Sequence, residues 1–235
     1  MIEPFHKFPR TPHLFWVGQD APRDDKVLNQ TDAAAFLAGE VLVEEKVDGA
    51  NLGLSLAPDG RVRAQSRANY LAPGKSHAQW NPLWPWIAER RAALEEGLQG
   101  GLILFGEWCY ARHSVPYDAL PDWFLAFDIY ETHSGRFWSA VRRNQWLQGR
   151  GIASVPEIKR GRFSPKQAAA LLGRSRVGHV PMEGIYFRRE QGGWVEARAK
   201  MVSIEFKQQI EPHWTRRAVT PNQLAPRGRG RPDAS

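Results

Sequence analysis

The segment Glu45-Lys46-Val47-Asp48-Gly49 places a lysine at the end of an apolar run, beside carboxylates and a glycine. A lysine that acts as a nucleophile must lose its proton near neutral pH, and partial burial or neighbouring cations lower its pKa enough to allow this. Gly49 permits a tight backbone turn beside a bound ligand. The pattern therefore predicts a nucleophilic Lys46, although the same residues also suit a plain surface turn with a solvated lysine.

Further short motifs follow this segment along the chain. In chain order they are Arg67 in QSRAN, Glu107 in FGEW, Phe127 in FDIY, Glu183 in EGI, and Arg198 with Lys200 in RAK. Each is weak alone, but their order and spacing resemble the covalent nucleotidyltransferase superfamily of DNA ligases, RNA ligases and capping enzymes. The resemblance covers residues 40–202, which is most of the chain.

Three details favour RNA ligases of the RNA ligase 2 type within that superfamily. They are Asn51 after the glycine of the first motif, the Phe-Gly-Glu form at residues 105–107 and the Phe-Asp-Ile form at residues 127–129. This resemblance implies an ATP-grasp-like domain with the nucleotide between two antiparallel sheets. It also implies a three-step reaction, in which AMP moves from ATP to the lysine, then to an RNA 5′-phosphate, and is finally displaced by a 3′-hydroxyl.

The resemblance implies that four matching residues contact the nucleotide. Lys46 would attack the α-phosphate of ATP. Arg67 and Glu107 would bind the ribose hydroxyls, since an arginine donates to a hydroxyl and a carboxylate accepts from it. Phe127 would stack on adenine. Asp48, two residues after the lysine, is a weaker candidate.

The resemblance implies that a second group of residues binds the metal ion and the α-phosphate. Glu183 would hold Mg²⁺, or Mn²⁺ in its place, as a hard oxygen ligand. Lys200, together with Arg198, would neutralise the α-phosphate as charge develops in the transition state. Glu45 and Asn51 would be neighbours in the nucleotide pocket. Each charged residue also suits an ordinary strand position, and each aromatic suits a core position.

Hydrophobic patterning predicts the elements that carry these residues. Strands are expected at 41–47, 51–57, 61–67, 101–108, 123–131, 183–190 and 193–202, and helices at 32–38, 82–97, 139–147 and 166–172. Thr31 is the expected cap of the first helix, and Ser139 that of the helix that runs through Leu147. Hairpins outnumber strand–helix–strand units, so the fold class is α+β with two largely antiparallel sheets flanked by helices.

The chain divides by composition at about residue 211. Residues 1–211 form the expected adenylyltransferase catalytic domain. Residues 212–235 are rich in Pro, Arg and Gly, have little to bury, and are expected to be a flexible basic tail. Residues 201–235 are too few for the five strands of the OB-fold found in DNA ligases and capping enzymes, so no C-terminal OB-fold is expected.

Charge and composition point to the partner and the compartment. The net charge of +7 and the pI of about 9.8 favour a polyanion, here RNA, with a nicked duplex or an RNA–DNA hybrid among the acceptors. Cys109 is the single cysteine, no run approaches a membrane span, and a cytoplasmic protein is expected. A partner protein that helps to grip the substrate is a further expectation.

Several alternatives stay open at this stage. They are a minimal ATP-dependent DNA ligase, a capping guanylyltransferase that prefers GTP, and a non-catalytic module that binds nucleic-acid ends on the same scaffold. Ser114, which lies near His113, lacks the surroundings of a hydrolase nucleophile.

Overall fold

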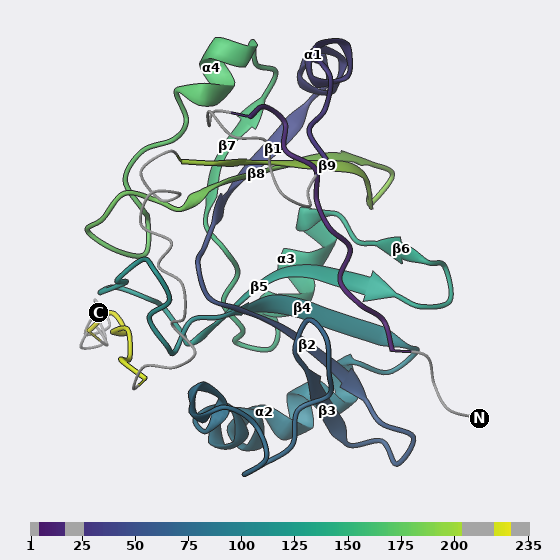
Figure 1. Cartoon of the computed structure of the whole chain (residues 1–235). Helices are drawn as coiled ribbons and strands as arrows, with labels where there is room; N and C mark the ends of the chain where they lie inside the picture. Colours follow the sequence, from purple (N-terminus) through teal and green to yellow (C-terminus); the bar gives the residue numbers. More distant parts are fainter. Residues whose placement is uncertain (1–4, 17–25, 204–218, 227–235) are drawn as a thin grey trace, which may run out of the picture.

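The protein folds into two antiparallel sheets that face each other, with most of the helices on their outer sides (Figure 1). The structure is a computed structural model and describes residues 5–16, 26–203 and 219–226. The α+β class and the two-sheet arrangement predicted from the sequence are confirmed. Within the described ranges, no helix is long and apolar enough to span a membrane.

The first sheet has the strand order β7-β1-β8-β9. Its strands are β1 (Val41–Lys46), β7 (Glu157–Gly161), β8 (Gly184–Gln191) and β9 (Trp194–Val202). Helices α1 (Gln30–Ala38) and α4 (Pro165–Ala169) cover its outer face (Figure 1).

Alternation along these strands separates core residues from site residues. Odd-numbered apolar residues pack beneath the helices, among them Val43, Phe187 and Met201. Even-numbered neighbours point toward the other sheet, and they include Lys46 and Lys200. One face of the first sheet therefore builds core, while the opposite face carries charged groups.

The second sheet has the order β3-β2-β4-β5-β6. Its strands are β2 (Ala50–Leu56), β3 (Val62–Gln65), β4 (Leu102–Trp108), β5 (Phe124–Glu131) and β6 (Arg136–Phe137). The covering helices are η1 (Ala78–Trp80), α2 (Leu83–Gly97) and α3 (Ala140–Gln148). Trp80, Trp86 and Trp108 join the apolar core between α2 and this sheet.

The chain passes from one sheet to the other at the lysine motif. Strand β1 ends at Lys46 in the first sheet, and β2 begins at Ala50 in the second. The three residues between them cross the gap. Lys46 therefore lies where the two sheets meet, which is where a nucleotide between the sheets would bind.

Some predicted boundaries were wrong. Asn29, rather than Thr31, caps α1, because its Oδ1 accepts from the amide of Asp32 at 2.8 Å. Helix α4 ends at Ala169, earlier than expected. Strand β7 was missed because its sequence EIKRG is an exposed edge strand with no apolar alternation.

The C-terminal tail differs from the expected flexible segment in the part that the structure describes. Residues 219–226 pair with the loop that follows β4, and Asn222 is buried. The remainder of the predicted tail, residues 212–218 and 227–235, lies outside the described residues. The division into a catalytic domain and a tail stays a prediction.

Candidate nucleotide site

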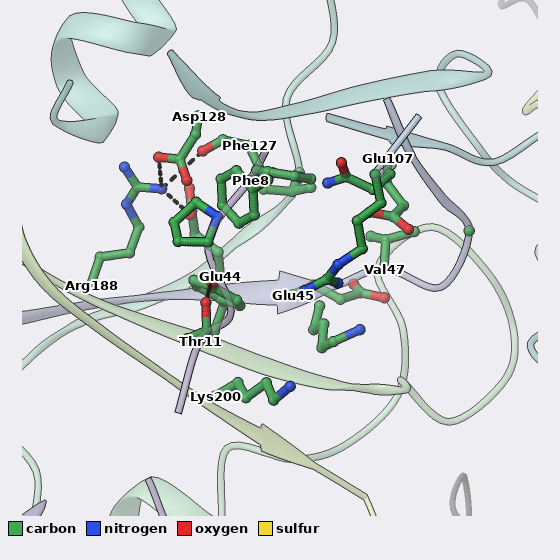
Figure 2. Close-up of a pocket in the computed structure, with 17 residues that line it drawn as sticks. Phe8, Thr11, Glu44, Glu45, Val47, Glu107, Phe127, Asp128, Arg188 and Lys200 are labelled. Carbon is green, nitrogen blue, oxygen red and sulfur yellow. Dashed lines mark hydrogen bonds and ion pairs between the residues drawn. The ribbon is translucent and has the colours of Figure 1, made fainter. Parts of the chain in front are cut away.

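A cavity of about 340 Å³ lies between the two sheets (Figure 2). It is lined by residues from both sheets, from the crossing turn and from the segment near the N-terminus: Phe8, Pro9, Thr11, Glu44, Glu45, Lys46, Val47, Gly49, Asn51, Arg67, Glu107, Phe127, Asp128, Val155, Tyr186, Arg188 and Lys200. Seven of the ten residues assigned from the sequence are among them, namely Glu45, Lys46, Asn51, Arg67, Glu107, Phe127 and Lys200.

Lys46 is held by a carboxylate that directly precedes the neighbouring strand β8. Its Nζ donates to both oxygens of Glu183, at 2.5 and 2.6 Å, although the two residues are 137 positions apart. Burial lowers the pKa of Lys46, but the negative charges of Glu183, Glu107 and Asp48 outweigh burial and raise that pKa above its ordinary value. The expectation that the surroundings lower the lysine pKa was therefore wrong for this arrangement, in which the amine is protonated.

The pKa values of the carboxyl groups beside Lys46 are raised as well, which for a carboxyl group favours the neutral form. Burial raises the pKa of Glu107 to about 8, helped by the negative charges of Glu183 and Asp48 and opposed by Lys46. Burial likewise raises the pKa of Glu183 to about 7, against the influence of Lys46. Buried carboxylates this close repel one another, and a bound cation would relieve that repulsion.

A divalent cation fits this donor set only with help from other ligands. Among the described residues, no group of three or more His, Cys, Asp or Glu side chains has the geometry to hold a metal ion. Mg²⁺ typically takes one or two carboxylates and completes its shell with water and substrate phosphates. Glu183 suits that kind of site.

Asp48 shapes the crossing turn. Its Oδ2 accepts from the backbone amides of Ser114 at 2.8 Å and Val115 at 3.0 Å, and its own amide donates to the Tyr117 hydroxyl at 2.7 Å. Next to it, a Cβ on Gly49 would lie 2.7 Å from the carbonyl oxygen of Trp108. Glycine is needed there because backbone approaches backbone, and Asp48 acts on the turn rather than on the cavity.

Asn51 and Phe127 both line the cavity and could each contact a bound ligand. The Oδ1 atom of Asn51 is buried and has no hydrogen-bond partner among the described residues. A buried polar atom without a partner is costly unless a ligand or water satisfies it. The ring of Phe127 is half-buried and meets Phe8 edge-on, with their centroids 5.0 Å apart (Figure 2).

The segment at residues 5–16 was missed by the sequence analysis. Phe8, Pro9 and Thr11 line the cavity. Farther along the segment, the amide of Lys200 donates to the carbonyl of Pro12 at 2.9 Å, and the carbonyl of Lys200 accepts from the Leu14 amide at 2.8 Å. This segment therefore forms one wall of the cavity and fixes the backbone that carries Lys200.

Two of the assigned residues point elsewhere. The guanidinium of Arg198 lies 2.9 Å from Asp128 and 3.8 Å from the ring centroid of Phe137, and Arg198 does not line the cavity. The carboxylate of Glu45 accepts from the hydroxyl of Ser175 at 2.5 Å and from the Arg176 amide at 2.8 Å. Glu45 borders the cavity, but its side chain holds a neighbouring loop.

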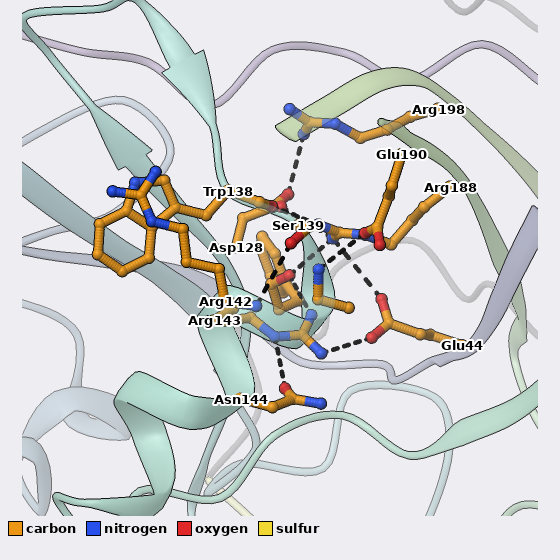
Figure 3. A network of polar contacts seen from close by, with 12 residues as sticks. Glu44, Asp128, Trp138, Ser139, Arg142, Arg143, Asn144, Arg188, Glu190 and Arg198 are labelled. Atoms are coloured by element: carbon orange, nitrogen blue, oxygen red, sulfur yellow. Dashed lines mark hydrogen bonds and ion pairs between the residues drawn. The ribbon is translucent and has the colours of Figure 1, made fainter. Parts of the chain in front are cut away.

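A buried cluster of six charged residues joins the two sheets beside the cavity (Figure 3). It comprises Glu44, Asp128, Arg143, Arg188, Glu190 and Arg198. Arg188 lies 2.8 Å from Asp128, 2.9 Å from Glu190 and 3.6 Å from Glu44, while Arg143 lies 2.6 Å from Glu44. We call these residues the charged cluster.

The charged cluster also holds the aromatic wall of the cavity. The Phe127 carbonyl accepts from Arg143 at 2.5 Å and from Arg188 at 2.8 Å. The only hint in the sequence was a charged residue within an apolar strand, as with Glu44 in VLVEEK and Arg188 in GIYFRRE.

Comparison with known proteins agrees with this geometry. A family model for RNA ligase matches residues 39–202. The fold is similar to Naegleria gruberi RNA ligase with PPi, at 21% identity and a TM-score of 0.59, covering 74% of this chain and 52% of that one. A variant of that ligase with ATP and Mn gives 20% identity and a TM-score of 0.60, covering 87% of this chain and 57% of that one.

These structural matches concern the fold, because their identities are low. This chain spans little more than half the length of the ligase it matches. Comparison with curated protein sequences gives no match.

Proposed function

The chain belongs to the RNA ligase family, and we propose that it is an ATP-dependent RNA ligase that forms a lysyl-AMP intermediate on Lys46 and seals 5′-phosphate to 3′-hydroxyl ends. The observation that carries this proposal is the position of Lys46. Its amine lies in a cavity that also contains an aromatic ring, carboxylates and a second lysine, Lys200. Together these groups suit a base, a ribose and a phosphate.

In the proposed first step, the Lys46 Nζ attacks the α-phosphorus of ATP. A P–N bond forms, the bond to the β-phosphate oxygen breaks, and pyrophosphate leaves with its electron pair. Lys200 stabilises the negative charge that develops on the α-phosphate oxygens. Phe127 stacks on adenine, while Arg67 and Glu107 bind the ribose.

In the later steps, an RNA 5′-phosphate oxygen attacks the lysyl-AMP phosphorus and breaks the P–N bond. The 3′-hydroxyl of the other end then attacks the activated 5′-phosphate, loses its proton and displaces AMP. Glu183 would hold Mg²⁺ or Mn²⁺. That cation would supply positive charge that lowers the pKa of the lysine amine and offsets the phosphate charge.

The test is covalent labelling. The protein, mixed with α-labelled ATP and Mg²⁺, should acquire label that survives denaturation, and Lys46→Ala should acquire none. Lys166→Ala is a matched control, because Lys166 is an exposed lysine on α4, and it should label like the unaltered protein. Equal labelling of the Lys46→Ala variant would remove the basis of the proposal.

The acceptor is tested separately, with nicked RNA duplexes, RNA–DNA hybrids and all-DNA nicks. The proposal expects nicks with RNA ends to be sealed faster than all-DNA nicks. Preferential sealing of all-DNA nicks would assign a DNA ligase, and labelling by GTP rather than ATP would assign a capping enzyme. Binding of RNA ends without any labelling would leave a non-catalytic end-binding module. Whether a partner protein contributes to substrate grip is tested by sealing with the purified chain alone.

A further inference from the structure

Residues 219–226 form a strap across the loop that follows β4, which comprises residues 109–120. The Arg112 amide donates to the Thr220 carbonyl at 2.8 Å, and the Ala225 amide donates to the Leu120 carbonyl at 2.8 Å. Between these points, the backbone of Gln223 exchanges two further bonds with the loop, at 2.9 and 3.1 Å. The strap is therefore bonded to the loop along most of its length.

Asn222 is the one buried polar side chain of the strap, with 5% exposure. Its Oδ1 accepts from the Tyr117 amide at 2.9 Å, and its Nδ2 donates to the Cys109 carbonyl at 2.8 Å. Its backbone amide donates to the Tyr110 carbonyl at 2.8 Å. One asparagine thus ties the start of the loop to its far side, and loss of its amide would leave buried backbone groups without partners.

The same loop determines the position of the turn that carries the nucleophile. The Ser114 and Val115 amides donate to the Asp48 carboxylate, and the Asp48 amide donates to the Tyr117 hydroxyl. Asp48 lies two residues after Lys46. A continuous chain of hydrogen bonds therefore runs from Asn222 through Tyr117 to the turn beside the reactive amine.

We propose that Asn222 is a positioning residue for the adenylylation of Lys46, acting through Tyr117 and Asp48. The proposal rests on the proposed function, in that Lys46 is the residue adenylylated. Asn222 itself does not line the cavity. Its contribution is to hold the loop so that the crossing turn presents the lysine at a fixed place, and small errors in such placement are costly to reaction rate.

The test measures the single-turnover rate of lysyl-AMP formation at saturating ATP and Mg²⁺ in the full chain. Asn222→Ala should slow this step about 10-fold to 100-fold while ATP affinity changes much less. Tyr117→Phe removes only the hydroxyl that accepts from Asp48 and should also slow the step. Gln223→Ala is the matched control, because that side chain is exposed while its backbone bonds remain.

A double-mutant cycle separates positioning from general stability. If Asn222 acts through Tyr117, the double variant should be little slower than the slower single variant. The proposal is overturned if the rate reductions of the two single variants multiply in the double variant. It is also overturned if Asn222→Ala forms lysyl-AMP at the normal rate, or if Gln223→Ala slows the step as much as Asn222→Ala does. Should Asn222→Ala fail to fold, Tyr117→Phe decides, because an unchanged rate there breaks the postulated chain.

Hydrogen exchange gives a readout that does not depend on ligase activity. In Asn222→Ala, the amides of Asp48, Ser114 and Val115 should lose protection relative to those of the first sheet. Unchanged protection overturns the positioning role even if the protein proves to have no adenylylation activity. Failure of the proposed function would instead appear as absence of label in the unaltered protein with the exchange result intact.

Discussion

Arg188→Met should destabilise the protein strongly because Arg188 lies at the centre of the charged cluster. The cluster has three arginines and three carboxylates, so its formal charge is zero. The Arg188 side chain is 1% exposed, as is that of Asp128, its partner at 2.8 Å. Methionine fills similar volume but leaves a buried excess of one negative charge.

The size of the effect follows from this burial. Removing one partner of a buried ion pair costs about 3–5 kcal/mol, because the other charge stays in a low-dielectric environment without compensation. For a chain of this length each kcal/mol lowers Tm by about 2–4 °C, so the expected fall is roughly 6–20 °C. Thermal unfolding followed by circular dichroism measures it directly.

Arg160→Met is the matched control. Arg160 also pairs with carboxylates, but its side chain is 35% exposed and its pairs span 3.8 to 4.0 Å. Exposed pairs contribute about 0–1 kcal/mol, so its Tm should change by a few degrees at most. Adding Asp128→Asn to Arg188→Met should recover part of the loss in Tm, because it removes the uncompensated negative charge. The reasoning is refuted if Arg188→Met and Arg160→Met lower Tm equally.

Two more predictions concern the cavity itself. The raised pKa of Glu107, about 8 against 4.5 for the ordinary group, means that the folded state binds a proton more tightly than the unfolded state. Its stabilising contribution is complete below about pH 4.5 and is lost as pH rises through about 8, so the free energy of unfolding in urea, measured without metal, should fall over that window. Glu107→Gln should flatten the decline, and an unchanged slope would count against the assignment. Phe127→Leu keeps apolar volume but loses the ring, and it should raise the KM for ATP about 5-fold to 150-fold; an unchanged KM would show that no base stacks there.

Sequence reasoning was successful where the signal is local. Alternation within the strands located the two sheets, and Ser139 caps α3 as its place before a helical segment predicted. The order of the motifs also identified residues that the fold brings to one cavity, such as Arg67 and Phe127. Phe127 lies in β5, a strand that the apolar pattern predicted independently, whereas Arg67 lies just past the end of β3, which is shorter than predicted.

Sequence reasoning failed where a residue's role depends on a distant partner. Asn222 lies in a segment rich in Pro, Arg and Gly, and its side-chain partners are more than 100 positions away. Arg198 matched a motif, yet Asp128, from the other sheet, holds its guanidinium away from the cavity lining. Phe8 lies in a segment with no strand or helix pattern, and only the tertiary fold brings it against Phe127. Register and sheet pairing determine these contacts, and neither is encoded in a short window.

The charge around Lys46 illustrates the same limit and has a chemical consequence. Its neighbours in sequence suggested burial beside an apolar strand, which lowers a lysine pKa. The decisive groups are Glu107 in β4 and Glu183 just before β8, and their negative charge raises the lysine pKa instead. A protonated amine has no lone pair with which to attack phosphorus. Under the proposed mechanism, Lys46 can therefore react only after positive charge, such as that of a divalent cation, has offset these carboxylates.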